Sequence, residues 1–561
     1  MVGSNSVHEC DVIIVGAGLA GLSAARELLR REPNLKILIL EAKGRVGGRT
    51  LTAPIKAARA ARTQIDLGAT WVSHSHKNIL DLLNDFHIGT FPQHCDGKAW
   101  CQFGLSRPRC YRSSNIIRQV PLREAFDVWW SVRRMQRLAE KVDVNDLFRW
   151  DFATELNEIS VGQWIRQNTW SRSGQDVLEI ATRALYGVEP NRINMLYHLA
   201  ACKSAGSISE LMSDEEGGAR ALRVEGGTQQ IANRLAEEVG TDCIRLHRAV
   251  NRIEVDEANG ITRVHFFSTD GSDEKGAYVC SQVITAIPPN QCARIDFSPT
   301  LPHLKRLAFE ASIPGNLIQF VITYETAFWR EEGWSGEVIS SGRTTKRGEV
   351  LPIICTYDYC NSSGCPALVG FISEEYADMS KSDRCNAVVQ DLMRFFGDRA
   401  MHQFLDYQEK DWSLDPFGGG GPCTVMPCGM MNSWHTLREP FITVHFAGTE
   451  TATKWIGHME GAVQSGLRAA HEVLHQLGYH DKVSNTILKG TVYDSDYKPP
   501  QSAITHYREK KSPWLRRLFF VTALCVGIFA YSKKYRLSYT ARAVRPLEKA
   551  IVKYSTGIEW P

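Results

Sequence analysis

The stretch from Asp11 to Thr50 constrains the fold more than any other part of this chain. It opens with a short, β-branched apolar run, Val12 to Val15, which is typical of a buried parallel strand. Three glycines, a helical pattern (Leu22 to Arg31) and a second apolar run follow, and that second run ends on Glu41. The glycines have the spacing GxGxxG and are Gly16, Gly18 and Gly21. This strand–turn–helix–strand–acid unit predicts a Rossmann-like fold that binds a dinucleotide.

The residue types of this unit suit that role. The glycines permit a tight turn and let the backbone approach a pyrophosphate at the helix N-terminus. Glu41 is placed to accept hydrogen bonds from an adenosine ribose. A GxGxxG pattern alone would be weak evidence, and the flanking strands and acid are what make the prediction specific.

The segment that follows Glu41 indicates which dinucleotide is bound. It reads AKGRVGGRT, and its paired glycines would bring a second backbone loop onto the cofactor. Arg49 could pair with the phosphates in a fork that lysine cannot reproduce. The alternative is an ordinary basic turn after a strand. With Arg45 and Gly48, the E-x3-R-x-GGR pattern resembles the FAD-binding entry of the flavin amine oxidase superfamily, and this resemblance favours FAD over NAD as the cofactor.

Composition excludes several other classes. A chain of 561 residues is too long for one core, so we expect two or three domains. The net charge of +3 gives no case for a nucleic-acid partner. The 15 cysteines have no CxxC pair and no ligand-like spacing, which predicts free thiols, a reducing compartment and no metal site. Residues 1–10 are polar and lack the apolar core of a signal peptide.

Later segments are expected to return to the cofactor. The segment Asp66–Trp71, which contains Gly68, follows a basic, alanine-rich loop (Lys56 to Arg62) and resembles the second cofactor-side segment of the flavin amine oxidases. Val224 to Thr228 opens the helical pattern Gln229–Val239, and Val250 lies in a strand-like run. The strand-like run Val283–Ile287 ends at a double proline, Pro288-Pro289. The segment Thr443–Glu450 is a short strand with Gly448 and an acid, Glu450, that could bind ribityl hydroxyls. Near Met459 a helix begins, and its N-terminus would favour negative charge on a reduced flavin.

These segments predict an α/β protein with a discontinuous Rossmann-like FAD-binding domain, a mixed α+β substrate domain and a C-terminal membrane helix. The expected boundaries alternate between the two domains. FAD-binding segments are 1–75, 221–295 and 416–480; substrate-domain segments are 76–220 and 296–415; a linker (481–513), a membrane anchor (514–535) and a basic tail (536–561) follow.

The anchor is predicted from an uncharged run, Leu518 to Tyr531, with basic residues on both sides. About fourteen residues is short, because a full hydrocarbon core takes about twenty. Flanking arginines and lysines can snorkel, and Trp514 and Tyr531 lie where interfacial aromatics are found. A buried core helix is the alternative interpretation.

With these pieces placed, residues 10–478 resemble the monoamine oxidases, and the tail extends the resemblance. It is carried by GAGLAGL, GRVGGRT, the VEGG segment, AIPP and HFAGTETATKWIGHMEGAVQSG. The resemblance implies FAD and oxidative deamination of a primary or secondary amine by O2, giving an aldehyde, ammonia or an amine, and H2O2. It also implies a tail in the mitochondrial outer membrane with the catalytic part facing the cytosol. An endoplasmic reticulum location and a homodimer stay open.

The sequence departs from the family at the positions that matter most for this chemistry. Counted from Trp412, the flavin-linking cysteine falls on Gly421, so we expect non-covalent FAD unless a local shift brings Cys423 to the flavin. In the family, two tyrosines form the opposite walls of an aromatic cage. One of these tyrosine positions falls on Pro422, and the other falls on His458. Proline and histidine cannot reproduce a tyrosine cage, and His458 could also be a polar core residue.

The family's lysine near the flavin falls on Arg294, which keeps a positive charge but does not lose its proton. Arg294 could order water, stabilise a flavin anion, or bind a substrate carboxylate. The predicted catalytic residues are therefore Arg294, Trp412 and His458, with Pro422 and His458 as substrate-binding residues.

Three functions compete at this stage. The first is an active FAD amine oxidase with an altered pocket. The second is another flavin oxidoreductase of the same fold, such as a desaturase-like or porphyrinogen-oxidase-like enzyme. The third is a membrane-bound FAD-binding protein that has lost turnover. We expect the first.

Overall fold

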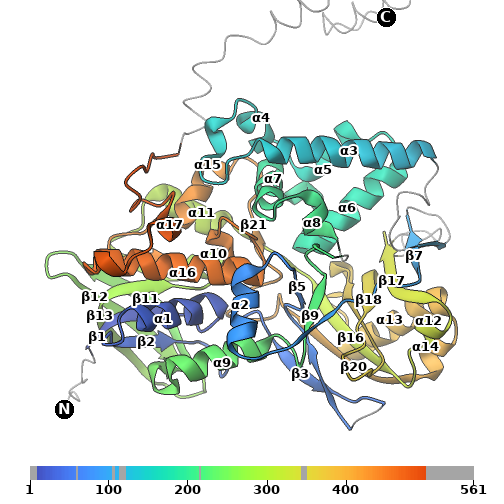
Figure 1. Cartoon of the computed structure of the whole chain (residues 1–561), viewed down its shortest axis with the longest axis horizontal. Helices are drawn as coiled ribbons and strands as arrows, with labels where there is room; N and C mark the ends of the chain where they lie inside the picture. Colours follow the sequence, from blue (N-terminus) through green and yellow to red (C-terminus); the bar gives the residue numbers. More distant parts are fainter. Residues whose placement is uncertain are drawn as a thin grey trace, which may run out of the picture. The chain divides into compact units, whose positions relative to one another are not determined.

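The computed structural model describes residues 9–58, 61–103, 108–112, 122–213, 216–342 and 350–500 (Figure 1). The predicted membrane anchor and basic tail, 514–561, lie outside these residues. Within the described part of the chain, no helix is both long enough and apolar enough to cross a membrane.

The first sheet is the predicted Rossmann-like core. Its central strands β2 (Ile37–Leu40), β1 (Glu9–Val15), β13 (Lys275–Thr285) and β22 (Val444–Phe446) run parallel to one another. On one side β10 (Ile244–Arg245) joins β2; on the other, β12 (Ile261–Ser268), β11 (Arg248–Asp256) and β14 (Asp296–Ser298) complete eight strands. The α/β class is confirmed.

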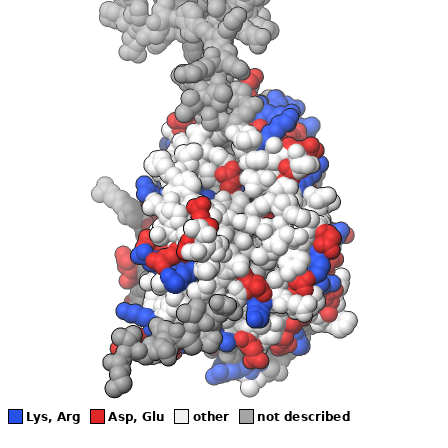
Figure 2. Space-filling view, turned by 90° about the vertical axis from the view of Figure 1, so that its left-hand side faces the viewer, with Lys and Arg blue, Asp and Glu red and all other residues white. Residues whose placement is uncertain are grey.

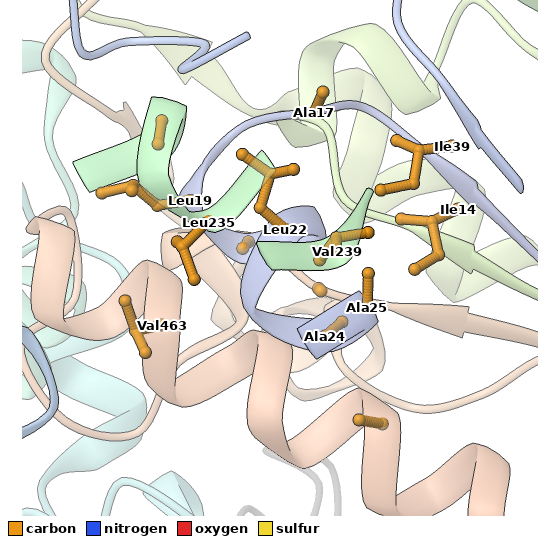
Figure 3. Packing of buried hydrophobic residues seen from close by; sticks show 14 of the residues in the cluster. Ile14, Ala17, Leu19, Leu22, Ala24, Ala25, Ile39, Leu235, Val239 and Val463 are labelled. Atoms are coloured by element: carbon orange, nitrogen blue, oxygen red, sulfur yellow. The ribbon is translucent and has the colours of Figure 1, made fainter. Parts of the chain in front are cut away.

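Helix α1 (Leu19–Arg31) is packed between this sheet and two further helices, α9 (Gln229–Val239) and α16 (Met459–Gln476). Figure 3 shows Leu22, Ala24 and Ala25 of α1 close to Leu235 and Val239 of α9, with α16, which carries Val463, running below α1 in this view. The predicted helix began at Leu22, but α1 begins three residues earlier. Gly21 therefore lies inside the first turn, where a Cβ would come 2.0 Å from the carbonyl oxygen of Gly16. Only glycine fits that close contact.

The second sheet has seven strands in the order β20-β16-β19-β18-β17-β7-β8. These are β20 (Phe404–Asp411), β16 (Ile318–Tyr324), β19 (Ala367–Ile372), β18 (Ile353–Asp358), β17 (Trp334–Ser340), β7 (Lys98–Gln102) and β8 (Arg109–Arg112). Every residue of β16 and β18 is buried. One face of these strands packs on α13 (Lys381–Phe396), and the other packs on a second core cluster that includes Ile55, Ile65 and Ile180. The sheet joins strands from residues 98–112 with strands from 318–411.

A helical layer lies between residues 122 and 212. It contains α3 (Leu122–Glu140), α4 (Ala153–Asn157), α5 (Val161–Asn168), α6 (Arg172–Tyr186), α7 (Met195–Ser204) and α8 (Ile208–Met212). Helix α7 is at the centre, since nine of its ten side chains are buried, Lys203 being the exception. Helices α3 and α6 coincide with helical patterns of the sequence at 122–142 and 173–186.

Short elements connect these layers. They are β3 (Thr52–Ile55), β4 (Thr63–Asp66), β5 (Trp71–Val72), α2 (Lys77–Asp85), β6 (Thr90–Pro92), β9 (Leu222–Val224), α10 (Pro289–Cys292), α11 (His303–Ala311), β15 (Ile313–Pro314), α12 (Phe328–Glu331), α14 (Arg399–His402), β21 (Thr424–Val425), α15 (Met431–Trp434) and α17 (Asn485–Leu488). On the face drawn in Figure 2, acidic and basic side chains are interspersed, in keeping with the small net charge of +3.

Candidate active site

A cavity of about 460 Å³ lies between the two sheets, and its lining residues come from segments that range from Val15 to Ala462. Most of the residues predicted to bind cofactor or substrate line it. They are Gly16, Gly18, Glu41, Gly48, Arg49, Gly68, Val250, Arg294, Trp412, Gly421, Pro422, Gly448, His458 and Met459. The structure therefore brings together positions that are hundreds of residues apart in the sequence.

One end of the cavity is built for a nucleotide. Gly18 directly precedes α1, and the backbone of the second glycine loop comes so close that a Cβ on Gly48 would lie 3.3 Å from the Cα of Gly18. At the end of β2, the carboxylate of Glu41 accepts the backbone N–H of Ala17 at 2.7 Å and that of Lys43 at 2.9 Å. Burial raises the pKa of Glu41, and the two backbone donors oppose that rise.

Three predicted residues do not line the cavity but support those that do. Gly21 allows α1 to pack against the turn. The guanidinium of Arg45 donates to the carbonyl oxygens of Val46, Gly48 and Thr50, and so fixes the second glycine loop. Glu450 lies behind the wall, where it binds Arg49.

Arg49 and Glu450 form an ion pair with each other, a contact that was not predicted. Arg49 Nη1 lies 2.6 Å from Glu450 Oε1, and Nη2 lies 3.0 Å from Oε2. Arg49 also donates to the carbonyl oxygen of Pro422 at 2.9 Å, and the N–H of Thr424 donates to Glu450 at 3.1 Å. Burial alone would raise the pKa of Glu450, but Arg49 holds it below its usual value. The predicted contacts of Arg49 with phosphates and of Glu450 with ribityl hydroxyls stay predictions.

The other end of the cavity is aromatic. The Trp71 ring lies 5.5 Å from that of Tyr357 in an edge-to-face contact and 6.5 Å from that of Phe371. Tyr186 also lines this end, and its hydroxyl is held by His198 Nδ1 at 2.9 Å. Tyr357, Phe371 and Tyr186 were not predicted, because nothing local in their sequence marks them. Trp71 lies in the same predicted cofactor-side segment as Gly68, but no role was predicted for it from the sequence.

Trp412 and Gly421 form one side of the wall. The Trp412 indole donates to the carbonyl oxygen of Leu67 at 2.9 Å, and a Cβ on Gly421 would lie 3.2 Å from its ring. Trp412 therefore positions the backbone at Leu67, and its indole N–H already has an acceptor there. Cys423 also lines the cavity, and burial raises the pKa of its thiol to about 12.

Arg294 lies on the exposed part of the lining. Its Nη1 donates to the carbonyl oxygen of Pro416 at 3.1 Å and is 3.5 Å from Gln291 Oε1. The hydrogen bond to the Pro416 carbonyl oxygen fixes the orientation of the Arg294 guanidinium.

His458 is the residue immediately before α16, and it is held in one tautomer. Its Nδ1 lies 3.1 Å from the carbonyl oxygen of Ile456, which can only accept, so Nδ1 carries the proton. Burial lowers the pKa of His458 to about 4, so the ring is neutral at pH 7 and its Nε2 lone pair is available. No described residue forms a hydrogen bond with Nε2, and the side chain lines the cavity.

A second histidine lies behind it. His76 is fully buried, and its Nδ1 accepts the N–H of Ser73 at 3.1 Å. The His76 ring is 4.3 Å from Trp455 and 5.9 Å from His458. Burial, with the neighbouring His458 as a smaller cause, lowers the pKa of His76 to about 2. Sequence reasoning missed His76, since a lone histidine in a loop carries no signal.

Comparison with known proteins identifies this arrangement. The family model described as flavin containing amine oxidoreductase matches residues 19–474. The chain belongs to this family.

Individual relatives agree. The AofH protein of Mycobacterium tuberculosis, named as a flavin-containing monoamine oxidase, is 35% identical over 84% of this chain and 98% of its own length. The flavin-containing amine oxidase B of Canis lupus familiaris is 27% identical over 94% of this chain and 98% of its own length. Among solved structures, wild-type putrescine oxidase bound to putrescine superposes with a TM-score of 0.74 at 27% identity, over 83% of this chain and 99% of that chain. The resemblance to monoamine oxidases is confirmed.

FAD is the cofactor of this amine oxidase, and the residues present fit it. The cradle formed by Gly18 and Gly48 is open only because neither residue has a side chain. Glu41 offers a buried carboxylate at the position expected for a ribose, and α1 begins at the same end of the cavity. Among the described residues, no group of three or more histidine, cysteine or acidic side chains could hold a metal ion.

Proposed function

We propose that this amine oxidase acts on primary or secondary monoamines that carry an apolar substituent. One observation carries the proposal. Of the described residues that line the cavity, Glu41 is the only acid, and it lies at the nucleotide end, whereas the other end is aromatic. A monoamine can place its substituent against the rings of Trp71, Tyr357 and Phe371. The second ammonium group of a diamine would find no carboxylate there.

The chemistry divides between cofactor and protein. FAD, when bound, supplies the two-electron oxidation of the amine. The aromatic end excludes water and packs the substituent. His458 Nε2 accepts an N–H of the neutral amine and so orients it. The N-terminus of α16, where Met459 lines the cavity, contributes positive partial charge toward the place where negative charge develops.

Activity with an amine panel tests this proposal. Peroxide release and anaerobic bleaching of the flavin absorbance are measured with benzylamine, phenethylamine, cyclohexylamine and putrescine. We expect turnover of the first three and a kcat/KM for putrescine that is lower by roughly 100-fold, because an unpaired ammonium is costly in an apolar site. Equal or better turnover of putrescine would contradict the proposal.

A second candidate substrate is an amine that carries a carboxylate. The Arg294 cation on the lining favours it, because a guanidinium binds a carboxylate in a two-point fork. An L-amino acid therefore belongs in the panel. The Arg294→Lys variant should lower the activity on the amino acid and leave benzylamine unchanged; an unchanged substrate profile would exclude this role.

A third candidate is an FAD-binding protein without turnover, because Gly421, Pro422, His458 and Arg294 all depart from the family. Bleaching of the flavin by any amine of the panel excludes it. Bound flavin with neither bleaching nor peroxide would favour it.

We also propose that the tail anchors the enzyme in the mitochondrial outer membrane with its catalytic part in the cytosol. The apolar run 518–531, its basic flanks and its interfacial aromatics support the anchor. The match to the canine relative covers 94% of the chain, more than residues 1–500 can supply, so it continues into the tail. Carbonate extraction and protease accessibility of mitochondria and microsomes test membrane, orientation and location together. Release of the full chain by carbonate would contradict the anchor.

A further inference from the structure

Gln93 directly follows β6 and connects two parts of the aromatic end of the cavity. It is 8% exposed, and both ends of its side-chain amide form hydrogen bonds. Its Oε1 accepts the indole N–H of Trp71 at 2.9 Å, and its Nε2 donates to the carbonyl oxygen of Asp358 at 2.8 Å. Trp71 lines the cavity from β5, and Asp358 follows Tyr357, which lines it from β18. The amide therefore bridges the two strands that carry these rings.

A carboxamide suits both partners of this bridge. The Trp71 indole can only donate, whereas the carbonyl oxygens of Asp358 and of His94, the second at 3.2 Å, can only accept. Glutamine offers one acceptor and one donor group, so the partners fix its orientation. A flipped amide would place donor against donor and acceptor against acceptor. The direction of the Trp71 ring is thus specified through Gln93.

Both supports of the bridge are themselves fixed. Gln93 continues the small sheet β5-β9-β6, since its N–H donates to the carbonyl oxygen of Ala221 at 2.9 Å. The carboxylate of Asp358 accepts two hydrogen bonds from the Arg330 guanidinium, both at 2.7 Å, and one from the Trp329 indole at 2.8 Å. Groups that the fold already orders can position a ring without further ordering when substrate binds. The bridge is therefore rigid enough to hold a ring in one orientation.

We propose that Gln93 is a positioning residue that sets the selectivity of this amine oxidase for ring-bearing substituents; the inference rests on the proposed function, in which the substituent packs at the aromatic end. The Trp71 ring lies edge-to-face with that of Tyr357 at 5.5 Å and 6.5 Å from that of Phe371. Because such contacts depend on ring orientation, a rotating Trp71 ring would lose the surface on which a flat substituent packs. Gln93 does not line the cavity, so it acts through Trp71.

Ligand binding to variants of the full-length FAD enzyme tests this role. Benzyl alcohol is the probe, because it carries the ring of benzylamine but no amine, and its Kd is measured from the change in the visible flavin spectrum. Gln93→Met removes both hydrogen bonds at similar volume, and Trp71→Phe removes the indole N–H. Gln282→Met is the matched control, since Gln282 is 5% exposed, lies 3.3 Å from His445 Nε2 and does not line the cavity.

We expect Gln93→Met to raise the Kd of benzyl alcohol by roughly 5- to 10-fold, which corresponds to one hydrogen bond. Gln282→Met should leave the Kd within about two-fold of wild type. In a double-mutant cycle, Gln93→Met should add less than about two-fold in the Trp71→Phe background, because its effect passes through the indole N–H. With benzylamine, Gln93→Met should raise KM by the same factor and leave kcat within about two-fold.

A second variant, Gln93→Glu, separates positioning from a purely structural role. As a neutral acid, the introduced carboxyl group can accept from the indole and donate its O–H to the Asp358 carbonyl oxygen. As a carboxylate it has no donor, and burial raises its pKa. In this variant the Kd of benzyl alcohol should be close to the wild-type value at about pH 6 and should rise toward about pH 9, whereas that of wild type stays level. The flavin spectrum and thermal unfolding of each variant confirm folding.

A Kd for Gln93→Met equal to that of wild type would overturn the inference, and so would additive effects in the cycle. No saturable binding of benzyl alcohol to wild type would also overturn it, because the rings would then form no site for a substituent. Failure of the proposed function gives a different result: the Kd of benzyl alcohol depends on Gln93 as expected, but wild type oxidises putrescine better than benzylamine. The inference about Gln93 would then hold, and the substrate class would change.

Discussion

Arg49 and Glu450 are separated by 401 positions in the chain and meet in a two-point ion pair of 2.6 and 3.0 Å. Arg49 comes from the loop after β2, and Glu450 comes from the turn after β22, so the pair joins the first and last cofactor-side segments. Arg49 also holds the carbonyl oxygen of Pro422. The shape of the cavity wall between the cofactor end and the substrate end depends on this pair.

Removing one charge of the pair should destabilise the protein more than removing both. Glu450→Gln leaves the guanidinium of Arg49 without its counter-charge, which for a buried pair costs about 3–5 kcal/mol. Arg49→Met/Glu450→Leu should recover part of that loss. Urea unfolding measures the free energies, and retention of FAD on gel filtration measures the site. A loss below about 1 kcal/mol for Glu450→Gln would mean that solvent screens the pair.

His458 should make the enzyme discriminate between amines by their N–H groups. A neutral tertiary amine has no N–H to donate to Nε2, whereas a neutral primary amine does. Loss of one such hydrogen bond corresponds to roughly 10-fold in kcat/KM. We expect benzylamine to exceed N,N-dimethylbenzylamine by about that factor in wild type, and His458→Phe to abolish the difference. An unchanged ratio in His458→Phe would show that the residue is only part of the wall.

His76 and His458 should make the folded protein less stable as the pH falls. The folded pKa values of His76 and His458, about 2 and about 4, lie below the unfolded value of 6.5. The unfolded state therefore binds more protons below pH 6.5, and folding stability decreases as the pH falls from there toward 4. Between pH 7 and pH 5 each histidine contributes a loss of about 2 kcal/mol.

Urea unfolding at pH 7 and pH 5 measures this dependence. His76→Gln should reduce the loss by about 2 kcal/mol, and His265→Gln serves as a control, since His265 is half-buried on β12 at 3.0 Å from Glu254. If His76→Gln and wild type lose the same stability over this range, His76 is not held neutral in the folded protein.

The parts of the fold that were predicted are those whose signal is local. The strand, glycine turn and acid of residues 12–41 appear as expected, and the helix predicted at 229–239 has the bounds of α9. Helix α1 begins earlier than predicted because the packing of Gly21 against Gly16 overrides the low helix propensity of glycine.

The parts that were missed depend on contacts between distant segments. No sequence pattern near Arg49 or Glu450 states that they pair, and the aromatic end of the cavity combines a short strand, β5, with two strands of the second sheet. His458 was found through the family resemblance alone. Its tautomer depends on the backbone carbonyl of Ile456, which no motif specifies.

FAD should be released by acid precipitation, leaving a yellow supernatant. Gly421 has no side chain at the position where the family links the flavin, and Cys423 is buried with the pKa of its thiol raised to about 12, so it stays protonated and weakly nucleophilic at pH 7. Cys423→Ser should therefore retain FAD and activity within about two-fold, the range of a small polar exchange. A yellow pellet from wild type that becomes colourless in Cys423→Ser would establish a covalent bond through Cys423 and would overturn this assignment.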